Sequence, residues 1–290
     1  MKYRQVTQII EPQMVIEGAD VLLRRSFGPS RANPLDPFLL FDNFAFNKPI
    51  EGPITGFPTH PHRGIETVTY MLEGSVRHRD SLGNIGVIGP GDVQWMTSGG
   101  GILHEEMPKR GLSGVVNGFQ LWVNLPADQK MSEPRYRGVN SAMIPRVEKD
   151  GVHVSIIAGN YEGVQGPVTE ITVQPLYMDI NLDPQTSFNL TIPEGHCALA
   201  YIFEGEGIFG VGDSSLGEIT KSIQMVVFGD GNNLQIKTQQ GTPARFLLIS
   251  GAPIREPIVP YGPFVMNTEE EIKQAFLELR AGTFVQGSKI

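Results

Sequence analysis

The pentapeptide Tyr70-Met71-Leu72-Glu73-Gly74 returns 131 residues later as Tyr201-Ile202-Phe203-Glu204-Gly205. A second pair of turn residues, Gly91-Asp92 and Gly229-Asp230, recurs at an offset of 138. In both copies an apolar run enters a glycine turn, and a second turn follows at the same distance, apart from an insertion of 7 residues in the second copy. This internal repetition predicts two copies of one strand-rich unit in a chain of 290 residues.

The rest of the chain favours an all-β fold. It contains 34 glycines and 22 prolines, and these separate many short apolar runs. Short runs bounded by turn residues are typical of β-sandwiches and β-barrels. We therefore expect antiparallel β-barrel or β-sandwich domains, with strands that include Val68–Leu72, Val93–Met96, Phe119–Leu125, Val152–Ala158, Ala198–Phe203, Gln224–Phe228 and Arg245–Ile249.

The boundary between the two copies is expected in the polar, proline-interrupted stretch between Leu125 and about Val152. This places a first domain at residues 1–130 and a second at residues 131–290. Near its end, the second domain carries a helical pattern. Thr268 and Glu271 have the spacing of a capping box, and Gly282 is a stop signal, so we expect a helix at about 268–281. The apolar stripe of this helix is expected to pack on the protein's own barrel.

Two short phrases each place two potential metal ligands two residues apart. His60 and His62 form the first pair, and His104 and Glu106 form the second. On an extended strand the side chains at i and i+2 point to the same face, so Glu106 shares a face with His104 and Glu105 does not. If the pairs face each other, they make a site of three histidines and one carboxylate.

The second copy acts as an internal control for this interpretation. The same offsets carry the four candidate ligands to Thr191, Pro193, Thr242 and Ala244, and none of these residues binds metals well. The second half has only His153 and His196, and neither is paired with another ligand at position i+2. We therefore expect the metal in the first domain and none in the second.

Composition narrows the function classes. The net charge is −8, which argues against direct nucleic-acid binding because that needs a basic face. Cys197 is the only cysteine, so no disulfide can form within the chain. The sequence shows no signal peptide and no run of 18 apolar residues that could span a membrane. We expect a cytoplasmic protein, or a nuclear one in a eukaryote, and a monomer.

Five stretches resemble the pirin family of the cupin superfamily. The matches run from about Arg24 to the final helix and include DPFLLFD (36–42), HPHRG (60–64), GPGDVQWMT (89–97), GILHEEMP (101–108) and GPFVMNT (262–268). The resemblance implies a bicupin of two face-to-face β-barrels, with one mononuclear non-haem iron in the first. Residue by residue, it implies His60, His62, His104 and Glu106 as the ligands. In the wider cupin pattern a glutamate after the histidine pair often binds the metal, so Glu66 is an alternative ligand; otherwise we expect it to form a salt bridge or to support a ligand from behind.

Three imidazoles and a carboxylate suit Fe(II), and they also accept manganese, nickel, copper or zinc. Four protein ligands on an octahedral ion leave two open positions, which fits a dioxygenase. The leading hypothesis, supported by the resemblance, is cleavage of a flavonol such as quercetin (the quercetin 2,3-dioxygenase type), with Glu106 as ligand and proton acceptor. Candidate pocket walls are Phe57, Val76, Trp95 and Gln120. For Gln120 an equal alternative is a hydrogen bond that only satisfies the barrel interior.

A second hypothesis belongs to another class of function. Pirin-like proteins include regulators proposed to bind a transcription factor or a metabolic enzyme, with the oxidation state of iron as the switch. A one-unit change of charge in a partly dry site can bias nearby loops. The sequence marks no partner surface for this role.

Overall fold

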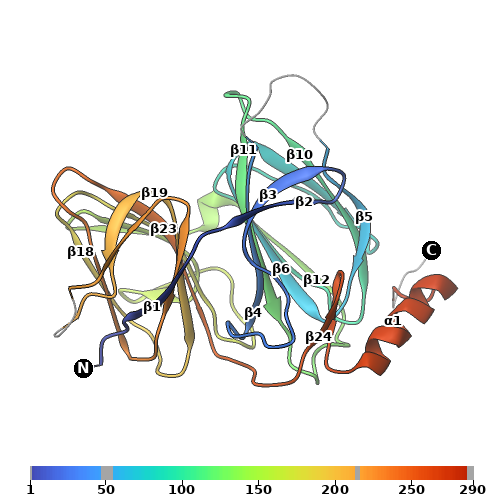
Figure 1. Cartoon of the computed structure of the whole chain (residues 1–290). Coiled ribbons are helices and arrows are strands. Elements are labelled where there is room, and N and C mark those ends of the chain that lie inside the picture. The colour runs from blue at the N-terminus through green and yellow to red at the C-terminus, as the bar shows by residue number, and fades with distance from the viewer. Residues whose placement is uncertain (1, 47–54, 213–215, 286–290) are drawn as a thin grey trace. The chain divides into compact units, whose positions relative to one another are not determined.

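The computed structural model describes residues 2–46, 55–212 and 216–285 (Figure 1). These residues form antiparallel β-sheets, one α-helix, α1 (Glu269–Ala281), and a 3-10 turn at Ser141–Met143. The expected all-β fold class is confirmed. Six of the seven apolar runs named from the sequence lie wholly inside strands, and the run Phe119–Leu125 extends one residue past its strand.

The chain divides into two compact units, and neither is continuous in sequence. The first unit contains Gln13–Ser141 and Ile254–Ile290, and the second contains Met1–Pro12 and Ala142–Pro253. The sequence analysis divided the chain at residue 130 and placed the helix with the second domain. In the structure the helix belongs to the first unit, because the segment before it pairs there: the Val265 N–H donates to the Arg63 carbonyl at 3.2 Å.

The first unit contains a seven-stranded and a four-stranded sheet. The seven-stranded sheet has the order β12 (Arg135–Val139), β9 (Val93–Thr97), β6 (Ile65–Glu73), β11 (Val116–Asn124), β4 (Phe38–Phe46), β3 (Val21–Phe27) and β2 (Gln13–Glu17). The four-stranded sheet has the order β5 (Phe57–His62), β10 (Ile102–Lys109), β7 (Ser75–Asp80) and β8 (Ile85–Ile88). A short hairpin of β24 (Val259–Tyr261) and β25 (Phe264–Met266) precedes α1.

The second unit contains one ten-stranded sheet. Seven of its strands are hydrogen-bonded side by side in the order β1 (Val6–Ile10), β21 (Gln224–Phe228), β19 (Cys197–Phe209), β23 (Ala244–Gly251), β17 (Leu176–Leu182), β14 (Val152–Ala158) and β13 (Arg146–Lys149). Three further strands complete the sheet. β20 (Glu218–Lys221) and β22 (Asn233–Lys237) each pair with β19, and β18 (Ser187–Thr191) pairs with β22. A small separate hairpin joins β15 (Asn160–Tyr161) and β16 (Val164–Gln165).

The sequence repeat marks equivalent places in the two units. Gly74 follows β6 with φ +74°, and Gly205 lies in β19 with φ +70°. A Cβ atom at these glycines would lie 2.7 Å from the Lys109 carbonyl oxygen and 1.9 Å from the Pro243 carbonyl oxygen, respectively. Both positions therefore require glycine for its left-handed backbone and for the close approach of a neighbouring strand. This shared requirement explains why the pentapeptide recurs.

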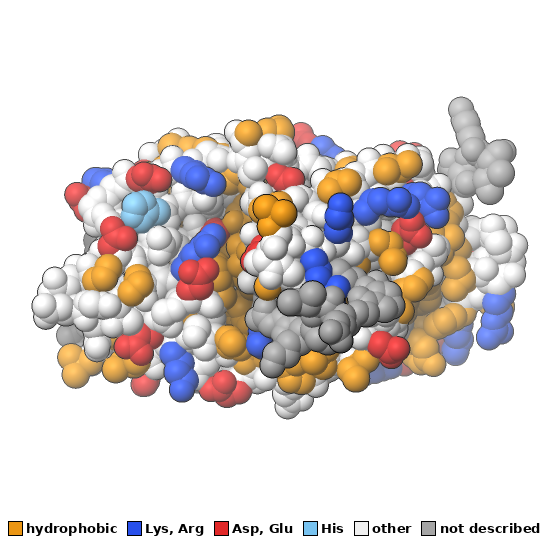
Figure 2. Space-filling view, turned by 90° about the horizontal axis from the view of Figure 1, so that it is seen from above, with side chains coloured by type: hydrophobic (Ala, Val, Ile, Leu, Met, Phe, Trp, Pro, Cys, Tyr) orange, Lys and Arg blue, Asp and Glu red, His pale blue; other side chains and the backbone are white. Residues whose placement is uncertain are grey.

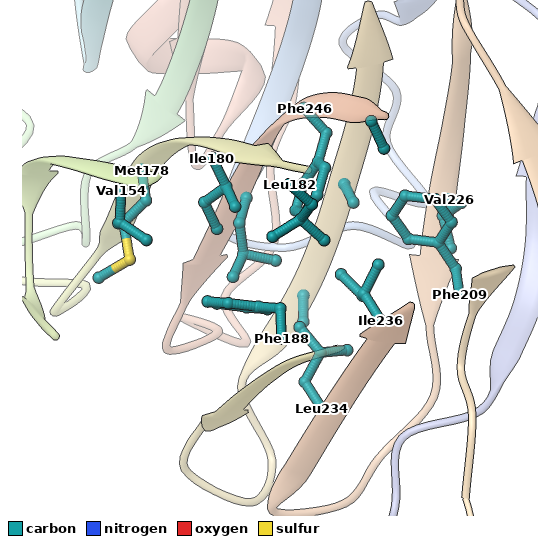
Figure 3. Close-up of a cluster of buried hydrophobic side chains, with 14 of the residues drawn as sticks. Val154, Met178, Ile180, Leu182, Phe188, Phe209, Val226, Leu234, Ile236 and Phe246 are labelled. Atoms are coloured by element: carbon teal, nitrogen blue, oxygen red, sulfur yellow. The ribbon is translucent and has the colours of Figure 1, made fainter. Parts of the chain in front are cut away.

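The interior of the second unit is filled with apolar side chains (Figure 3). Phe188, Phe209 and Phe246 are fully buried, and the rings of Phe209 and Phe246 pack edge to face at 5.3 Å. Burial of this kind contributes roughly 25 cal/mol for each Å² of apolar surface. The interior of the second unit is therefore a packed apolar core.

The C-terminal helix begins and ends as the sequence predicts. The side chain of Thr268 accepts a hydrogen bond from the Glu271 N–H, the Glu271 carboxylate accepts one from the Thr268 N–H, and Gly282 caps the other end with φ +72°. Ile272 and Ala275 are buried in one cluster with Phe264 and Phe284. The helix therefore packs its apolar face within its own unit, on the β24–β25 hairpin and Phe284 (Figure 1).

The face of the molecule in Figure 2 carries Lys and Arg side chains interspersed with Asp and Glu side chains. No broad basic surface is visible on this face, in keeping with the net charge of −8. Within the described part of the chain, no helix has the length and apolar character needed to cross a membrane.

Candidate metal centre and its cavity

Three histidines meet at the junction of β5 and β10. The two strands are antiparallel neighbours, and His104 on β10 lies directly opposite His60 on β5. The centre of the His104 ring lies 4.3 Å from the centre of the His60 ring and 5.0 Å from that of the His62 ring. One nitrogen from each ring lies within 4.8 Å of the other two. Ordinary strand pairing therefore brings His104 of the second pair to both histidines of the first pair.

Backbone carbonyls orient two of these rings. The Nδ1 atom of His60 lies 2.9 Å from the Pro58 oxygen, and that of His62 lies 3.1 Å from the Pro263 oxygen. A carbonyl can only accept, so each Nδ1 carries the proton and each Nε2 carries a lone pair. The two Nε2 atoms face each other at 3.2 Å, and the buried Nε2 of His104 has no hydrogen-bond partner. Converging lone pairs without donors fit a bound metal ion.

The surroundings of His62 and His104 favour the neutral form of these two rings, as metal binding requires. Burial, together with the neighbouring His60, lowers the pKa of His62 to about 3. Burial also lowers the pKa of His104 well below its ordinary value, and nearby His62, His60 and His78 add to the effect.

The carboxylate of Glu106 lies in a hydrogen-bonded network. Thr69 donates to its Oε1 at 3.3 Å, and the Gln120 amide donates to its Oε2 at 3.1 Å. The Trp122 indole donates in turn to the Gln120 oxygen at 3.2 Å. Glu106 groups with His104 and His78 within 4.8 Å, so His104 is common to two overlapping sets of potential ligands.

A cavity of about 540 Å³ opens onto this centre. His60, His62 and Glu106 line it, and so do three of the expected wall residues, Phe57, Val76 and Gln120. The remaining walls are mostly apolar, with Leu23, Leu40, Phe44 and Trp122 among them, and the polar part includes Glu17, Arg25 and Asp42.

The fourth expected wall residue, Trp95, is not among the residues that line the cavity. It is 1% exposed, and its indole donates to Glu66 at 3.1 Å. Side chains alternate along a strand, so Trp95 on β9 points away from the face that carries its neighbour Gln94. Glu66, the alternative ligand, also accepts from Thr97 at 2.7 Å and belongs to neither ligand group.

A row of polar residues crosses the large sheet of the first unit beside the metal centre. Strand register places Gln94, Thr69, Gln120, Asp42 and Arg25 opposite one another on successive strands. The four from Thr69 to Arg25 line the cavity, and Arg25 forms a two-pronged ion pair with Asp42 at 2.8 and 2.7 Å.

The equivalent row of the second unit is entirely apolar. The offset of 131 carries Thr69 to Ala200, and register from there gives Val226, Ala200, Leu248, Met178 and Ile156. All five belong to the buried core of that unit. The two units therefore share a backbone pattern, and the first uses the same positions to line a cavity.

The second unit places its histidines away from such a centre. His153 lies 3.4 Å from Asp183 at a partly exposed site, and the backbone oxygen of His196 accepts from Arg4 at 3.0 Å. Thr191 and Ala244, which the repeat aligns with His60 and Glu106, lie at an exposed strand end and in the apolar core.

The sequence analysis missed His78 and Asp80, which lie behind His104. His78 is 0% exposed, its Nδ1 lies 3.5 Å from the Nδ1 of His104, and its Nε2 lies 3.3 Å from Asp80. The signal was available, because His78-Arg79-Asp80 places two functional side chains at i and i+2 on a strand, as the other pairs do.

Comparisons with known proteins agree with this architecture. Residues 20–123 match the Pirin family model, and residues 177–285 match the model of the Pirin C-terminal cupin domain. The chain is 46% identical to "Pirin-like protein" of Solanum lycopersicum, over 92% of this chain and 88% of that one. It is 42% identical to "Pirin" of Homo sapiens, over 96% and 92%.

Among solved structures, the chain is similar to a quercetin 2,3-dioxygenase from Acinetobacter baumannii. The two share 32% identity, with a TM-score of 0.87 over 99% of this chain and 100% of that one. Two family models that together cover most of the chain, and relatives above 40% identity over nine-tenths of it, lead to one conclusion: the chain belongs to the pirin family.

Proposed function

We propose that this protein is a metal-dependent dioxygenase that opens the central ring of a flavonol such as quercetin. The observation that carries the proposal is the cavity of about 540 Å³, which has three of the four candidate metal ligands, His60, His62 and Glu106, in its wall. Cavities of roughly 300–1,000 Å³ are typical of sites for small organic molecules. The similarity to a structure named as a quercetin 2,3-dioxygenase supports the same substrate class.

The lining of the cavity suits a flat aromatic molecule with several hydroxyl groups. Leu23, Leu40, Phe44, Phe57 and Val76 offer apolar contacts for the rings. Asp42 and Glu17 offer acceptors for hydroxyl groups, and Arg25 holds both carboxylates in place through ion pairs at 2.7 Å.

His60, His62, His104 and Glu106 would hold the metal, and iron is the ion that we expect. When bound, the ion would supply Lewis acidity and redox chemistry towards dioxygen. The residues of the chain do the rest. Thr69 and Gln120 hold the Glu106 carboxylate towards the cavity, where it can accept the proton of a substrate hydroxyl. The apolar walls keep water away from the reacting ring.

The proposal is tested with purified protein of known metal content. Elemental analysis establishes the metal, and the loss of quercetin absorbance in air is followed together with the release of carbon monoxide. We expect turnover that is abolished by His62→Ala and unchanged by His153→Ala, a histidine of the second unit outside the site. Protein fully loaded with iron, manganese, nickel or copper that leaves quercetin intact would disprove the proposal.

A further inference from the structure

A buried chain of side chains leads away from the candidate metal centre. It runs from His104 on β10 to His78 and then Asp80 on the neighbouring strand β7. The Nδ1 atoms of the two histidines lie 3.5 Å apart, and the Nε2 atom of His78 lies 3.3 Å from the Asp80 Oδ2 atom. The exposed fractions of His104, His78 and Asp80 are 1%, 0% and 8%. Water therefore has little access to these three side chains.

Only one arrangement of protons satisfies every contact with neutral rings. The Asp80 carboxylate accepts, so the His78 Nε2 atom carries the proton and donates. The Nδ1 atom of His78 then holds a lone pair that faces the Nδ1 atom of His104. Two lone pairs would repel each other, so His104 carries its proton on Nδ1. Its Nε2 atom is left unprotonated, and this is the buried nitrogen without a partner.

His104 differs in this respect from the other two histidines. The tautomers of His60 and His62 are set by the carbonyl oxygens of Pro58 and Pro263, which no side-chain substitution removes. The tautomer of His104 depends instead on two side chains. A carboxylate behind a metal-binding histidine is a common way to set which nitrogen faces the metal.

We propose that Asp80 and His78 are positioning residues that hold His104 in the tautomer whose Nε2 faces the metal. The inference rests on the metal site of the proposed function, but it does not depend on which substrate that site accepts. Asp80 also has a structural role, because its Oδ1 atom accepts from the Leu82 and Asn84 N–H groups at 3.0 Å each. The test has to separate these two roles.

The substitution Asp80→Asn separates them. Two backbone N–H groups keep the asparagine oxygen at the turn, so the new NH2 group takes the place of Oδ2 and faces His78. The Asn84 side-chain amide, which donates to Oδ2 at 2.8 Å, can turn its oxygen towards the new group. An NH2 group donates, which reverses the tautomer of His78 and then that of His104, and the metal-facing nitrogen becomes protonated. The matched control is Asp92→Asn in the same unit, because Asp92 also accepts from turn N–H groups, those of Gly89 and Ser141, at 2.9 and 2.7 Å.

The first measurement is NMR of the metal-free protein labelled with 15N in its histidines. We expect His104 to carry its proton on Nδ1 in the wild type and in Asp92→Asn, and on Nε2 in Asp80→Asn. A purely structural role of Asp80 would weaken the turn without moving that proton. A proton on His104 Nε2 in the wild type, or no change of tautomer in Asp80→Asn, would overturn the proposal.

The second measurement is the affinity for Zn(II), a diamagnetic probe, by competition with a chromophoric chelator. We expect Asp80→Asn to weaken binding about 10- to 100-fold relative to Asp92→Asn, in line with other substitutions behind metal ligands. His78→Phe keeps the ring that stacks on Tyr136 at 4.9 Å but removes the acceptor, and should weaken binding similarly. His78→Asn restores an acceptor near Nδ1 and should recover most of the affinity.

The same zinc-loaded sample tests the rival arrangement, in which His78, His104 and Glu106 bind the ion. A 15N shift typical of a zinc-bound nitrogen on His78 would overturn the positioning role. None of these readouts uses quercetin, so a failure of the proposed dioxygenase activity and a failure of this inference are seen separately.

Discussion

At the scale of single residues, the site depends on hydrogen bonds that point side chains at one place. The i and i+2 spacing allowed the four candidate ligands to be named from the sequence, because strand geometry is local. The partners that orient them could not be named in the same way. Pro263 and Gln120 are distant from His62 and Glu106 in sequence, and only the fold brings them together.

The residue Gln120 is predicted to tune the metal site through Glu106. Gln120→Leu removes the donor at 3.1 Å from the Glu106 carboxylate, and a hydrogen bond to a charged group contributes roughly 1.5–3 kcal/mol. We expect metal affinity to fall about 10- to 100-fold, measured by chelator competition. Trp122→Phe is the comparison, because it removes the donor to Gln120 but keeps an aromatic ring beside His62, and it should have a smaller effect. Equal effects of the two variants would contradict this account.

The residue Lys130 gives a pH dependence. It is 1% exposed, and burial lowers the pKa of its ammonium group to about 7 in the folded protein. The unfolded chain binds more protons between that pKa and the ordinary value of 10.5, so stability rises with pH in this window. Titration of this one group can raise the free energy of unfolding by at most about 1.4 kcal/mol per pH unit.

We expect the free energy of unfolding of the wild type, minus that of Lys130→Met, to increase from pH 7 to pH 9 in urea titrations. Three oxygens, of Gly64, Asn124 and Val265, accept from the Lys130 amine at 2.7–2.8 Å and oppose the effect of burial. A difference that is flat in pH would mean that these acceptors keep the ammonium form across the window.

At the scale of elements, the C-terminal helix is tied to the strand that carries two candidate ligands. Arg63 follows His62 and is 1% exposed. Its guanidinium donates to the Gly100 carbonyl at 2.7 Å and to Glu278 on α1 at 2.5 Å, and it lies 4.4 Å from the centre of the Phe284 ring. The sequence predicted the helix and its caps, because these are local signals. It could not predict the docking partner, which is 215 residues away.

Breaking this ion pair is predicted to loosen the helix and the metal site together. Glu278→Ala leaves the buried Arg63 without its carboxylate, and the loss of one partner of a buried pair costs about 3–5 kcal/mol. Glu278 itself is 20% exposed, so we expect about 2–3 kcal/mol in urea unfolding. Glu270→Ala on the exposed face of the helix is the control and should change stability by less than about 0.5 kcal/mol. A small loss in Glu278→Ala would show that Arg63 finds other partners.

The two equivalent rows of the sheets give a matched pair of substitutions. Thr69→Ala removes the donor to Glu106 and should weaken metal binding with little loss of stability. Ala200→Thr places a hydroxyl in the filled interior of the second unit, where an unpaired polar group costs about 1–3 kcal/mol. Thermal unfolding and metal affinity are measured on both variants. Thr69→Ala should lower the metal affinity and leave the unfolding temperature nearly unchanged, and Ala200→Thr should do the reverse. A stability loss confined to Thr69→Ala would contradict the equivalence.

At the scale of the whole molecule, the sequence repeat predicted two β units correctly, because glycine turns such as Gly74 and Gly205 are local requirements of the backbone. It did not predict how the chain is shared between them. β1 pairs with β21 of the second unit, and α1 belongs to the first. Edge-strand pairing and helix docking depend on contacts across the whole chain, and these leave no periodic signal in a short segment.

The N-terminal strand β1 lies in the second unit and the C-terminal helix α1 lies in the first. This arrangement predicts the behaviour of fragments cut after residue 130. Fragment 1–130 lacks β24, β25 and α1, so His62 loses the Pro263 oxygen and Arg63 loses Glu278. Fragment 131–290 lacks β1, which leaves the edge of β21 unpaired. We expect neither fragment to fold alone, and fragment 1–130 to bind Zn(II) at least 10-fold more weakly than the full chain.

Co-expression of the two fragments should restore both units, because each fragment supplies the segment that the other lacks. Size-exclusion chromatography should show a one-to-one complex, and zinc affinity should return to within a few-fold of the full chain. Fragment 1–130 that binds zinc as tightly as the full chain would show that the C-terminal segment does not support the site. The metal centre would then depend only on the pairing of β5 with β10, where His60 and His104 already lie opposite each other.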